Sequence, residues 1–290
     1  MSIAPLVAGV AIAVWPTNPL DYSLLDLTFH SNGKVESRGY IAVNDETADT
    51  YRTGRWTIWH DSGHKHAEGN YKDGNKNGVW TTWYDNGQKE SVSGFKDGLM
   101  EGVTVSWFED GKKSREGAFR SDKQEGFWTW WHENGNKWEE GAWKDGKQEG
   151  FWSYWSTSGQ KSASGNCKNG NLEGVWTYWY DSGQQKRKGS FENDLQVGVW
   201  AWWHENGSKS REGNFESGSR EGVWSWWHEN GGKSREGTIK DGELEGVWTY
   251  WHENGVKSRE GAYAIGQKIG VWTCWDDSGN VTKRETYKRR

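Results

Sequence analysis

The segment EGVWTYWHENGVKSREGAYAIGQKIG, from Glu245 to Gly270, is the clearest copy of a 24-residue unit that repeats along the chain. One phase of the unit holds Trp in nearly every copy after residue 55, and Thr104 is its one interruption. These residues are Trp56, Trp80, Trp128, Trp152, Trp176, Trp200, Trp224, Trp248 and Trp272. Such a unit has too little apolar surface to fold alone, so neighbouring units must complete its core. The period therefore predicts a repeat array.

Each unit contains two strand patterns and two turn signals. GVWTYW is rich in aromatic and branched residues and leads into HENG, and KSREGAY leads into a second turn such as KDG at residues 96–98. A Gly after Asn or Asp closes a tight hairpin without a Cβ clash. We therefore expect an all-β fold, an elongated array of antiparallel β-hairpins. A single-chain β-helix is the alternative, because periodicity alone does not separate antiparallel from parallel stacking.

The composition favours a thin structure. The 290 residues include 25 Trp and 40 Gly, yet the mean hydropathy is -1.06, which is unlike a globule with a deep aliphatic core. The 36 basic and 41 acidic residues are interleaved, so the net charge of -5 comes from no single block. We expect no nucleic-acid partner, because phosphate binding needs a concentrated basic face. Cys167 and Cys274 stand where other units have aromatic residues, which favours small core residues over a disulfide.

The repeat divides the chain into three parts. Residues 1–23 are an apolar N-terminal segment, which is either a cap of the array or the remnant of an export signal. Residues 24–55 are a degenerate first repeat with a longer loop, and residues 56–290 are ten 24-residue repeats, the last of them truncated. The apolar run in the first part is too short to cross a bilayer as a helix. Both the bacterial cytoplasm and export to the cell envelope stay open as locations.

The consensus EGxWxxWHENGxKxxEGxFKDGxxEG resembles the MORN-repeat variant of bacterial YwqK-like proteins, which are often labelled antitoxins. The matching pieces include Glu173-Gly174 before a Trp, the turn Asn254-Gly255, and the step from Glu212 to Phe215. The resemblance covers nearly all of residues 24–290. It implies a curved antiparallel sheet of hairpins, a role in holding proteins together or binding membranes, and no catalytic residue. The Trp content is heavier than the family pattern requires.

Comparison between units assigns roles to the two faces of the sheet. Side chains alternate across a strand, so Val175 and Trp179 share one face while Trp176 and Tyr178 share the other. The first face has Trp in every unit, which suggests that it is the packed face. Its columns are Trp59, Trp83, Trp107, Trp131, Trp155, Trp179, Trp203, Trp227, Trp251 and Trp275, with Tyr71, Phe95, Phe119, Trp143, Phe191, Phe215 and Tyr263 from the second strand.

The second face varies between units, as a face released from packing would. We therefore expect an exposed ribbon of aromatic and histidine side chains, strongest from Trp202 to His252. The candidate binding residues are Trp130, Tyr154, Tyr178, Trp202, His204, Trp226, His228, Tyr250 and His252. The alternative is that these rings only shield a thin sheet from water.

No motif for metal or catalytic chemistry stands out. His204, His228 and His252 recur with the period, but equivalent positions lie about 9 to 10 Å apart, too far to share one zinc ion. Residues 73–78, DGNKNG, imitate the start of a calcium loop, but its twelfth position is Tyr84 instead of Glu. A uniform array offers no single preorganised constellation. We expect no catalytic residue, no metal site and no cofactor.

Three functions compete. The first is a non-enzymatic scaffold that binds a protein partner through Trp and Tyr, which are enriched at binding hot spots. The second is a carbohydrate-binding or choline-binding module that uses ring stacking. The third is a self-assembling structural protein that associates through its N-terminal segment. A protein partner is the primary expectation, and glycan binding and membrane contact stay open.

Overall fold

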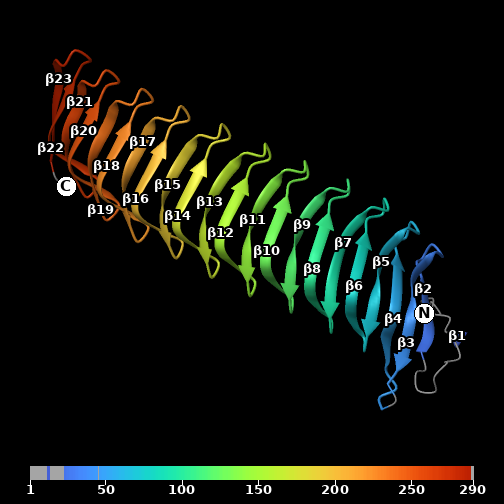
Figure 1. The fold of residues 1–290 in the computed structure, drawn as a ribbon. Helices are drawn as coiled ribbons and strands as arrows, with labels where there is room; N and C mark the ends of the chain where they lie inside the picture. Colours follow the sequence, from blue (N-terminus) through green and yellow to red (C-terminus); the bar gives the residue numbers. More distant parts are fainter. Residues whose placement is uncertain (1–11, 14–22, 45, 289–290) are drawn as a thin grey trace, which may run out of the picture. The chain divides into compact units, whose positions relative to one another are not determined.

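The computed structural model describes residues 12–13, 23–44 and 46–288, and the chain divides into two compact units, residues 1–147 and 148–290. Within each unit, consecutive strands pair antiparallel in chain order (Figure 1). This confirms the all-β hairpin array. The β-helix alternative is wrong, because a β-helix would place successive coils parallel to one another.

From β5 to β22 the strands alternate between eight and nine residues. In the first unit they are β1 (Ile12–Ala13), β2 (Ser23–Phe29), β3 (Val35–Val43), β4 (Thr50–Trp59), β5 (Lys65–Lys72), β6 (Asn75–Trp83), β7 (Lys89–Lys96), β8 (Leu99–Trp107), β9 (Lys113–Arg120), β10 (Lys123–Trp131) and β11 (Lys137–Lys144). β12 (Lys147–Trp155) begins at the boundary between the units. The second unit continues with β13 (Lys161–Lys168), β14 (Asn171–Trp179), β15 (Gln185–Glu192), β16 (Leu195–Trp203), β17 (Lys209–Glu216), β18 (Ser219–Trp227), β19 (Lys233–Lys240), β20 (Glu243–Trp251), β21 (Lys257–Ala264), β22 (Gln267–Trp275) and β23 (Val281–Tyr287).

The two turns of each repeat have the chemistry that the sequence predicts. In the first turn, the His252 amide donates to the Val256 carbonyl at 2.8 Å, and Gly255 has a φ of 84°. In the second turn, Asp241 and Gly242 have φ angles of 50° and 83°, which fits a type I′ hairpin. The Asp241 amide also donates to the Glu221 carboxylate of the preceding hairpin at 2.9 Å. The Glu-Gly step therefore bonds one repeat to the next.

The core consists of one indole per hairpin laid over one glycine. Trp248 is 1% exposed, and a Cβ placed on Gly237 of the preceding strand would lie 2.2 Å from its ring. The Trp248 Nε1–H donates to the Thr238 carbonyl at 3.1 Å. Because the glycine has no side chain, the ring lies flat on the backbone and its polar atom still finds an acceptor. The same arrangement recurs with Trp56, Trp80, Trp128, Trp176, Trp200, Trp224 and Trp272.

The packed face is therefore the opposite of the one expected. The column that begins with Trp56 is buried, whereas the column that begins with Trp59 is only half-buried. Tyr71, which was expected to pack with Trp59, instead meets Trp56 and Trp80 edge-on, with ring centroids 5.8 and 4.9 Å away. The expectation failed because both faces carry Trp, and only the glycine column decides which ring can be buried.

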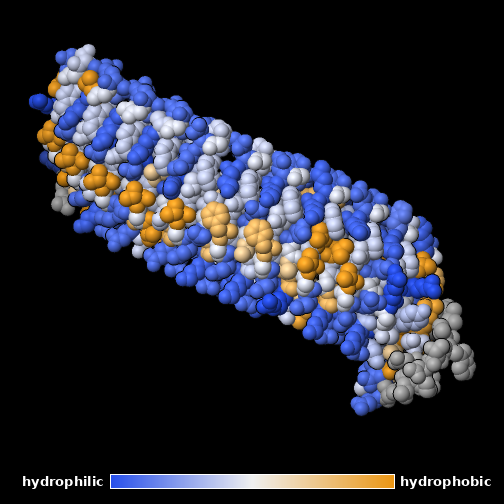
Figure 2. Space-filling view, viewed as in Figure 1, coloured by the Kyte–Doolittle hydropathy of each residue, from blue (hydrophilic) through white to orange (hydrophobic). Residues whose placement is uncertain are grey.

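The other face of the sheet carries exposed apolar side chains. In the repeats after residue 78, the residue before the buried Trp column is apolar and open to solvent, as in Val103, which is 64% exposed, and Val199, which is 63% exposed. Figure 2 shows an apolar row along the surface of the sheet. Ion pairs accompany this row, among them Lys233 with Glu236. The bonds from Lys233 and Ser225 hold the pKa of the Glu236 carboxyl below its usual value.

At the N-terminal end, β1 pairs antiparallel with β2, with Ile12 opposite Leu25. Most of residues 1–22 lies outside the described residues, so the cap and the export remnant both stay predictions. The expected longer loop of the first repeat lies between β3 and β4, where the Asn44 amide donates to the Asp49 carbonyl at 2.8 Å. Cys167 is buried, and burial raises the pKa of its thiol to about 11, as expected for a core residue.

Candidate interaction surface

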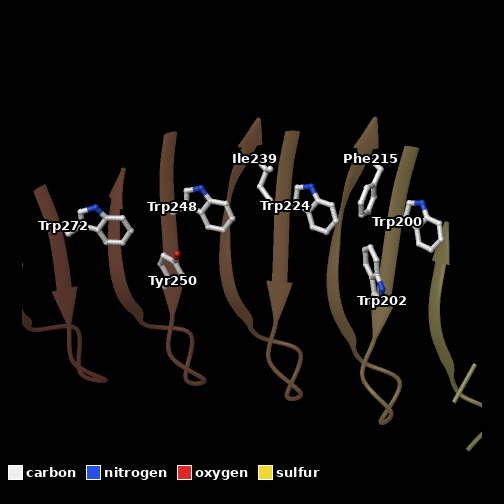
Figure 3. Packing of buried hydrophobic residues seen from close by; sticks show 8 residues of the cluster. All are labelled: Trp200, Trp202, Phe215, Trp224, Ile239, Trp248, Tyr250 and Trp272. Atoms are coloured by element: carbon white, nitrogen blue, oxygen red, sulfur yellow. The ribbon is translucent and has the colours of Figure 1, made fainter. Parts of the chain in front are cut away.

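A continuous ladder of aromatic rings runs along the packed face of the second unit. The residue two positions after each buried Trp adds a second ring to its hairpin, and these rings fill the spaces between successive tryptophans. The centroid of Trp202 lies 5.7 Å from that of Trp200 and 5.8 Å from that of Trp224. Figure 3 shows Trp202 and Tyr250 nearer to the first turns than the main Trp row. Each hairpin therefore contacts its neighbour through stacked rings as well as through the backbone.

Arginine side chains cover this second row of rings. The strand register places Arg211 opposite both Trp202 and Trp226, and its guanidinium carbon lies 4.2 Å from the Trp202 ring centroid. The same stacking joins Arg187 to Tyr178 at 3.9 Å. It joins Arg235 to Trp226 at 4.2 Å and Arg259 to Tyr250 at 3.9 Å. We call the set Tyr178, Arg187, Trp202, Arg211, Trp226, Arg235, Tyr250 and Arg259 the arginine–aromatic face.

The cations of this face lack acidic partners. From β13 to β22, the strand positions that share the face of the buried tryptophans hold no Asp or Glu. The acidic side chains of these strands lie on the other face, where Glu212 and Glu260 pair with Lys209 and Lys257. In the described part of the chain, none of the four arginines of the arginine–aromatic face forms an ion pair with a carboxylate. Charges that are interleaved in sequence are therefore separated by face.

Burial and mutual repulsion act on these arginines. Burial lowers the pKa of the Arg211 guanidinium, and the nearby charges of Arg220, Arg187 and Arg235 lower it further. An anion placed here would relieve that repulsion. The face also has a hollow of about 560 Å³ beside the first turns. Its lining includes Trp202, Trp226, Arg211, Arg235, Lys186 and His204.

The prediction that the aromatic ribbon is exposed to solvent is wrong. Trp202 is 9% and Tyr250 is 8% exposed, because arginine side chains and neighbouring rings cover them. Burial and a hydrogen bond with Tyr263 raise the pKa of Tyr250 to about 12. The other predicted aromatic residues are half-buried: Trp130, Tyr154, Tyr178 and Trp226. Whether any of them binds a partner stays a prediction.

The predicted histidines join one hairpin to the next. His204 Nε2 lies 3.0 Å from the Trp227 carbonyl oxygen, and His228 Nε2 lies 3.1 Å from that of Trp251. His252 makes the corresponding contact with Trp275 at 3.0 Å. Because a carbonyl only accepts, Nε2 of each ring carries the proton and donates it. These rings serve contacts between repeats.

In residues 12–13, 23–44 and 46–288, no three His, Cys, Asp or Glu side chains come together in an arrangement that could hold a metal ion. The calcium-like segment begins with Asp73 and Gly74, whose φ angles of 49° and 79° place them in the second turn between β5 and β6. Among the described residues, no helix has the length and apolar character needed to span a bilayer.

Sequence reasoning missed the arginine column. Arg187, Arg211, Arg235 and Arg259 recur at the 24-residue period, and this signal was visible in the sequence. Acidic and basic residues alternate along the chain, so the column emerges only when strand positions are assigned to faces. The premise that no basic stripe exists is therefore wrong for the second unit.

Comparison with known families identifies the repeat. The family described as MORN repeat variant matches residues 52–73, 76–97, 124–145, 172–193, 220–241, 244–264 and 268–289, which together are more than half of the chain. The chain belongs to the MORN repeat variant family. The resemblance found in the sequence is confirmed at this level, and MORN repeats are generally non-catalytic.

Other comparisons place no further constraint on this MORN repeat protein. No curated protein matches the chain. Two solved structures are similar over part of their length: a crystal structure of TcdB2-TccC3-Cdc42, and one of TcdB2-TccC3 without its hypervariable C-terminal region. Each is 8% identical, with a TM-score of 0.19. The alignments cover 91% and 92% of this chain, and this chain spans only 17% of each of those chains.

Proposed function

We propose that this MORN repeat protein is a non-enzymatic scaffold that binds a protein partner through the arginine–aromatic face. The observation that carries the proposal is the row of four guanidinium groups, each stacked on a ring and none paired with a carboxylate. Arg, Trp and Tyr are the residues most enriched at the energetic centres of protein interfaces. The resemblance to MORN-repeat variants, which implies a role in holding proteins together, also favours a protein partner.

A rigid platform supports such a role. The rings under the arginines are fixed by stacking against the buried tryptophans, as in Trp224 with Trp226 at 5.7 Å. A side chain already held in place loses little conformational freedom on binding. Because neighbouring repeats share backbone and turn hydrogen bonds, the arginines stand at a regular interval.

The choline alternative is less favourable on this face. A quaternary ammonium ligand needs an open aromatic ring face. Here the faces of Tyr178, Trp202 and Trp226 already carry a guanidinium. A cationic ligand would have to displace an arginine and meet the remaining ones. Glycan binding elsewhere and self-association through the N-terminal segment stay separate proposals.

Capture of partners from a native extract tests the function. The bait is the intact protein, and the test variant is Arg211→Gln, Arg235→Gln, Arg259→Gln. Its matched control is Lys209→Gln, Lys233→Gln, Lys257→Gln, which removes the same charge from the same three strands on the other face. Alanine substitution of Trp202 or Tyr250 is unsuitable for this test, because it would remove a core side chain.

We expect at least one protein, identified by mass spectrometry, to be retained by the intact protein and the lysine variant and lost with the arginine variant. Circular dichroism must show that both variants are folded. Retention of the same proteins by all three baits, or of none by the intact protein, would contradict the proposal.

A further inference from the structure

The spacing of the arginines restricts what can bind along them. Arg187, Arg211, Arg235 and Arg259 lie on alternate strands of one sheet: β15, β17, β19 and β21. Neighbouring strands are about 4.8 Å apart, so successive arginines are about 9.6 Å apart across the strands. A ligand that engages all four must offer acidic groups at nearly this interval.

Only one regular polypeptide conformation matches this interval well. Polyproline II has three residues per turn and a rise of about 3.1 Å per residue, so every third side chain lies on one side at about 9.3 Å intervals. A β-strand repeats its face every second residue, at about 6.7 Å. An α-helix repeats its face every seventh residue, at about 10.5 Å, and falls out of step by about 3 Å over three intervals.

We propose that the arginine–aromatic face binds an acidic polypeptide segment in the polyproline II conformation. The segment lies across the strands, with a carboxylate at every third residue paired to Arg187, Arg211, Arg235 and Arg259. Ten residues suffice to engage the four arginines. This inference rests on the proposed function, since it names the chemistry of the protein partner.

The chemistry of the face suits this occupant. A guanidinium that lies flat on a ring keeps its N–H edges free, and these edges bind a carboxylate through two parallel hydrogen bonds. A polyproline II segment is already extended before binding, so it loses little conformational freedom when it docks. The hollow beside Trp202 and Trp226 offers room for the apolar residues between the carboxylates.

The charge balance favours a short acidic segment over a large polyanion. The chain has a net charge of -5, and Glu212, Glu236 and Glu260 are on the other face of the same strands. A nucleic acid or an anionic membrane would extend over a large area and be repelled by the net negative charge of the rest of the chain. A segment about ten residues long meets only the cationic strip.

Two peptides of equal composition test the register. The first is an acetylated and amidated (Glu-Pro-Pro)4 peptide, and the control is (Glu-Pro)4 followed by four prolines. Fluorescence anisotropy of labelled peptides with the full chain gives both affinities. We expect the first peptide to bind at least about ten-fold more tightly than the control, because only its carboxylates match the arginine spacing.

The variants locate the binding. The variant Arg211→Gln, Arg235→Gln, Arg259→Gln is expected to lose at least about ten-fold in affinity for the first peptide. The variant Lys209→Gln, Lys233→Gln, Lys257→Gln is expected to bind it as the intact protein does. Equal binding of both peptides, or equal loss in both variants, would overturn the inference. So would tighter binding to phosphatidylserine vesicles or to a twelve-residue oligothymidylate than to the first peptide.

The inference and the proposed function fail in different ways. If neither peptide is preferred while capture still finds a protein that depends on the arginines, the scaffold function stands and the polyproline II inference is wrong. If capture finds no such protein, the proposed function is wrong whatever the peptides do.

Discussion

At the scale of single residues, each repeat depends on a contact between an indole and a glycine. The Trp ring occupies the volume that a side chain on the preceding strand would need, as at Gly237 beneath Trp248. This is a steric requirement of packing, because Gly237 has no left-handed backbone conformation. The glycine and the tryptophan of neighbouring strands therefore act as one structural element.

Substitution of Gly237 by Ala tests this contact. The new Cβ would lie 2.2 Å from the Trp248 ring, so the ring must shift and the core must reorganise. We expect the free energy of unfolding to fall by about 2 to 3 kcal/mol. Urea titration followed by Trp fluorescence measures the change.

Gly232→Ala, in the same hairpin, is the matched control. A Cβ there has its nearest contact at 3.2 Å, with the Asn230 side chain, and the equivalent positions in neighbouring repeats are Ser208 and Val256. We expect a change within about 0.5 kcal/mol. An equal cost at both glycines would show that the indole contact is not responsible.

At the scale of the hairpin, one repeat departs from this pattern in both partners at once. Thr104 replaces the buried Trp, and Ser93 stands where other repeats have the glycine beneath it. Both residues are buried, and the Thr104 hydroxyl has no hydrogen-bond partner among the described residues. A side chain on β7 is tolerated here because no indole lies over it. The paired change supports the steric argument from within one chain.

Restoring the common pair should show coupling between the two strands. Thr104→Trp alone is expected to destabilise the protein by about 1 to 3 kcal/mol, because the indole meets the Ser93 side chain. With Ser93→Gly added, we expect a stability about 2 kcal/mol above that of the original protein, since a ring is buried and an unpaired hydroxyl is removed. A double-mutant cycle from urea titrations gives the coupling. Additive effects of the two substitutions would contradict the contact.

At the scale of the whole molecule, the repeat makes stability local. Each hairpin contacts mainly its two neighbours, through strand pairing, stacked rings and turn contacts such as Asn230 to the Glu253 carbonyl at 2.8 Å. In such an array, stability is nearly a sum of repeat terms and nearest-neighbour terms. We therefore expect the protein to keep its fold when one whole repeat is removed or added.

Deletion of residues 209–232 tests this property. It joins Ser208 to Lys233 and reproduces the native junction, because Ser208 and Gly232 are equivalent. We expect a folded protein whose Tm falls by about 10 °C or less. Deletion of residues 209–220 removes half a repeat, including β17, so β18 follows β16 directly and every later strand runs opposite to its native direction relative to β13–β16. We therefore expect loss of cooperative unfolding. Circular dichroism melts compare the two, and similar melts would contradict nearest-neighbour stacking.

The sequence alone predicted the hairpin, its turns and the period, because these depend on local chemistry that each repeat carries in full. Asn-Gly and Asp-Gly turns set the reversals, and the alternation of side chains divides each strand into two sets. The paired change at Ser93 and Thr104 is also present in the sequence, but its meaning depends on the strand register. The candidate residues Trp202 and Tyr250 were correctly grouped on one face, but their exposure was not predicted correctly.

Alternation separates the residues of a strand into two faces, yet it does not say which face is buried when both carry Trp. That choice was made by packing between strands, where the column of glycines admits the indole of Trp176 and leaves Trp179 half-buried. The arginine–aromatic face likewise depends on contacts between different strands. Arg211 reaches Trp202 only because the register aligns them across β16 and β17. The sequence determined the repeating unit, and the tertiary structure decided which of its faces is core and where its cations gather.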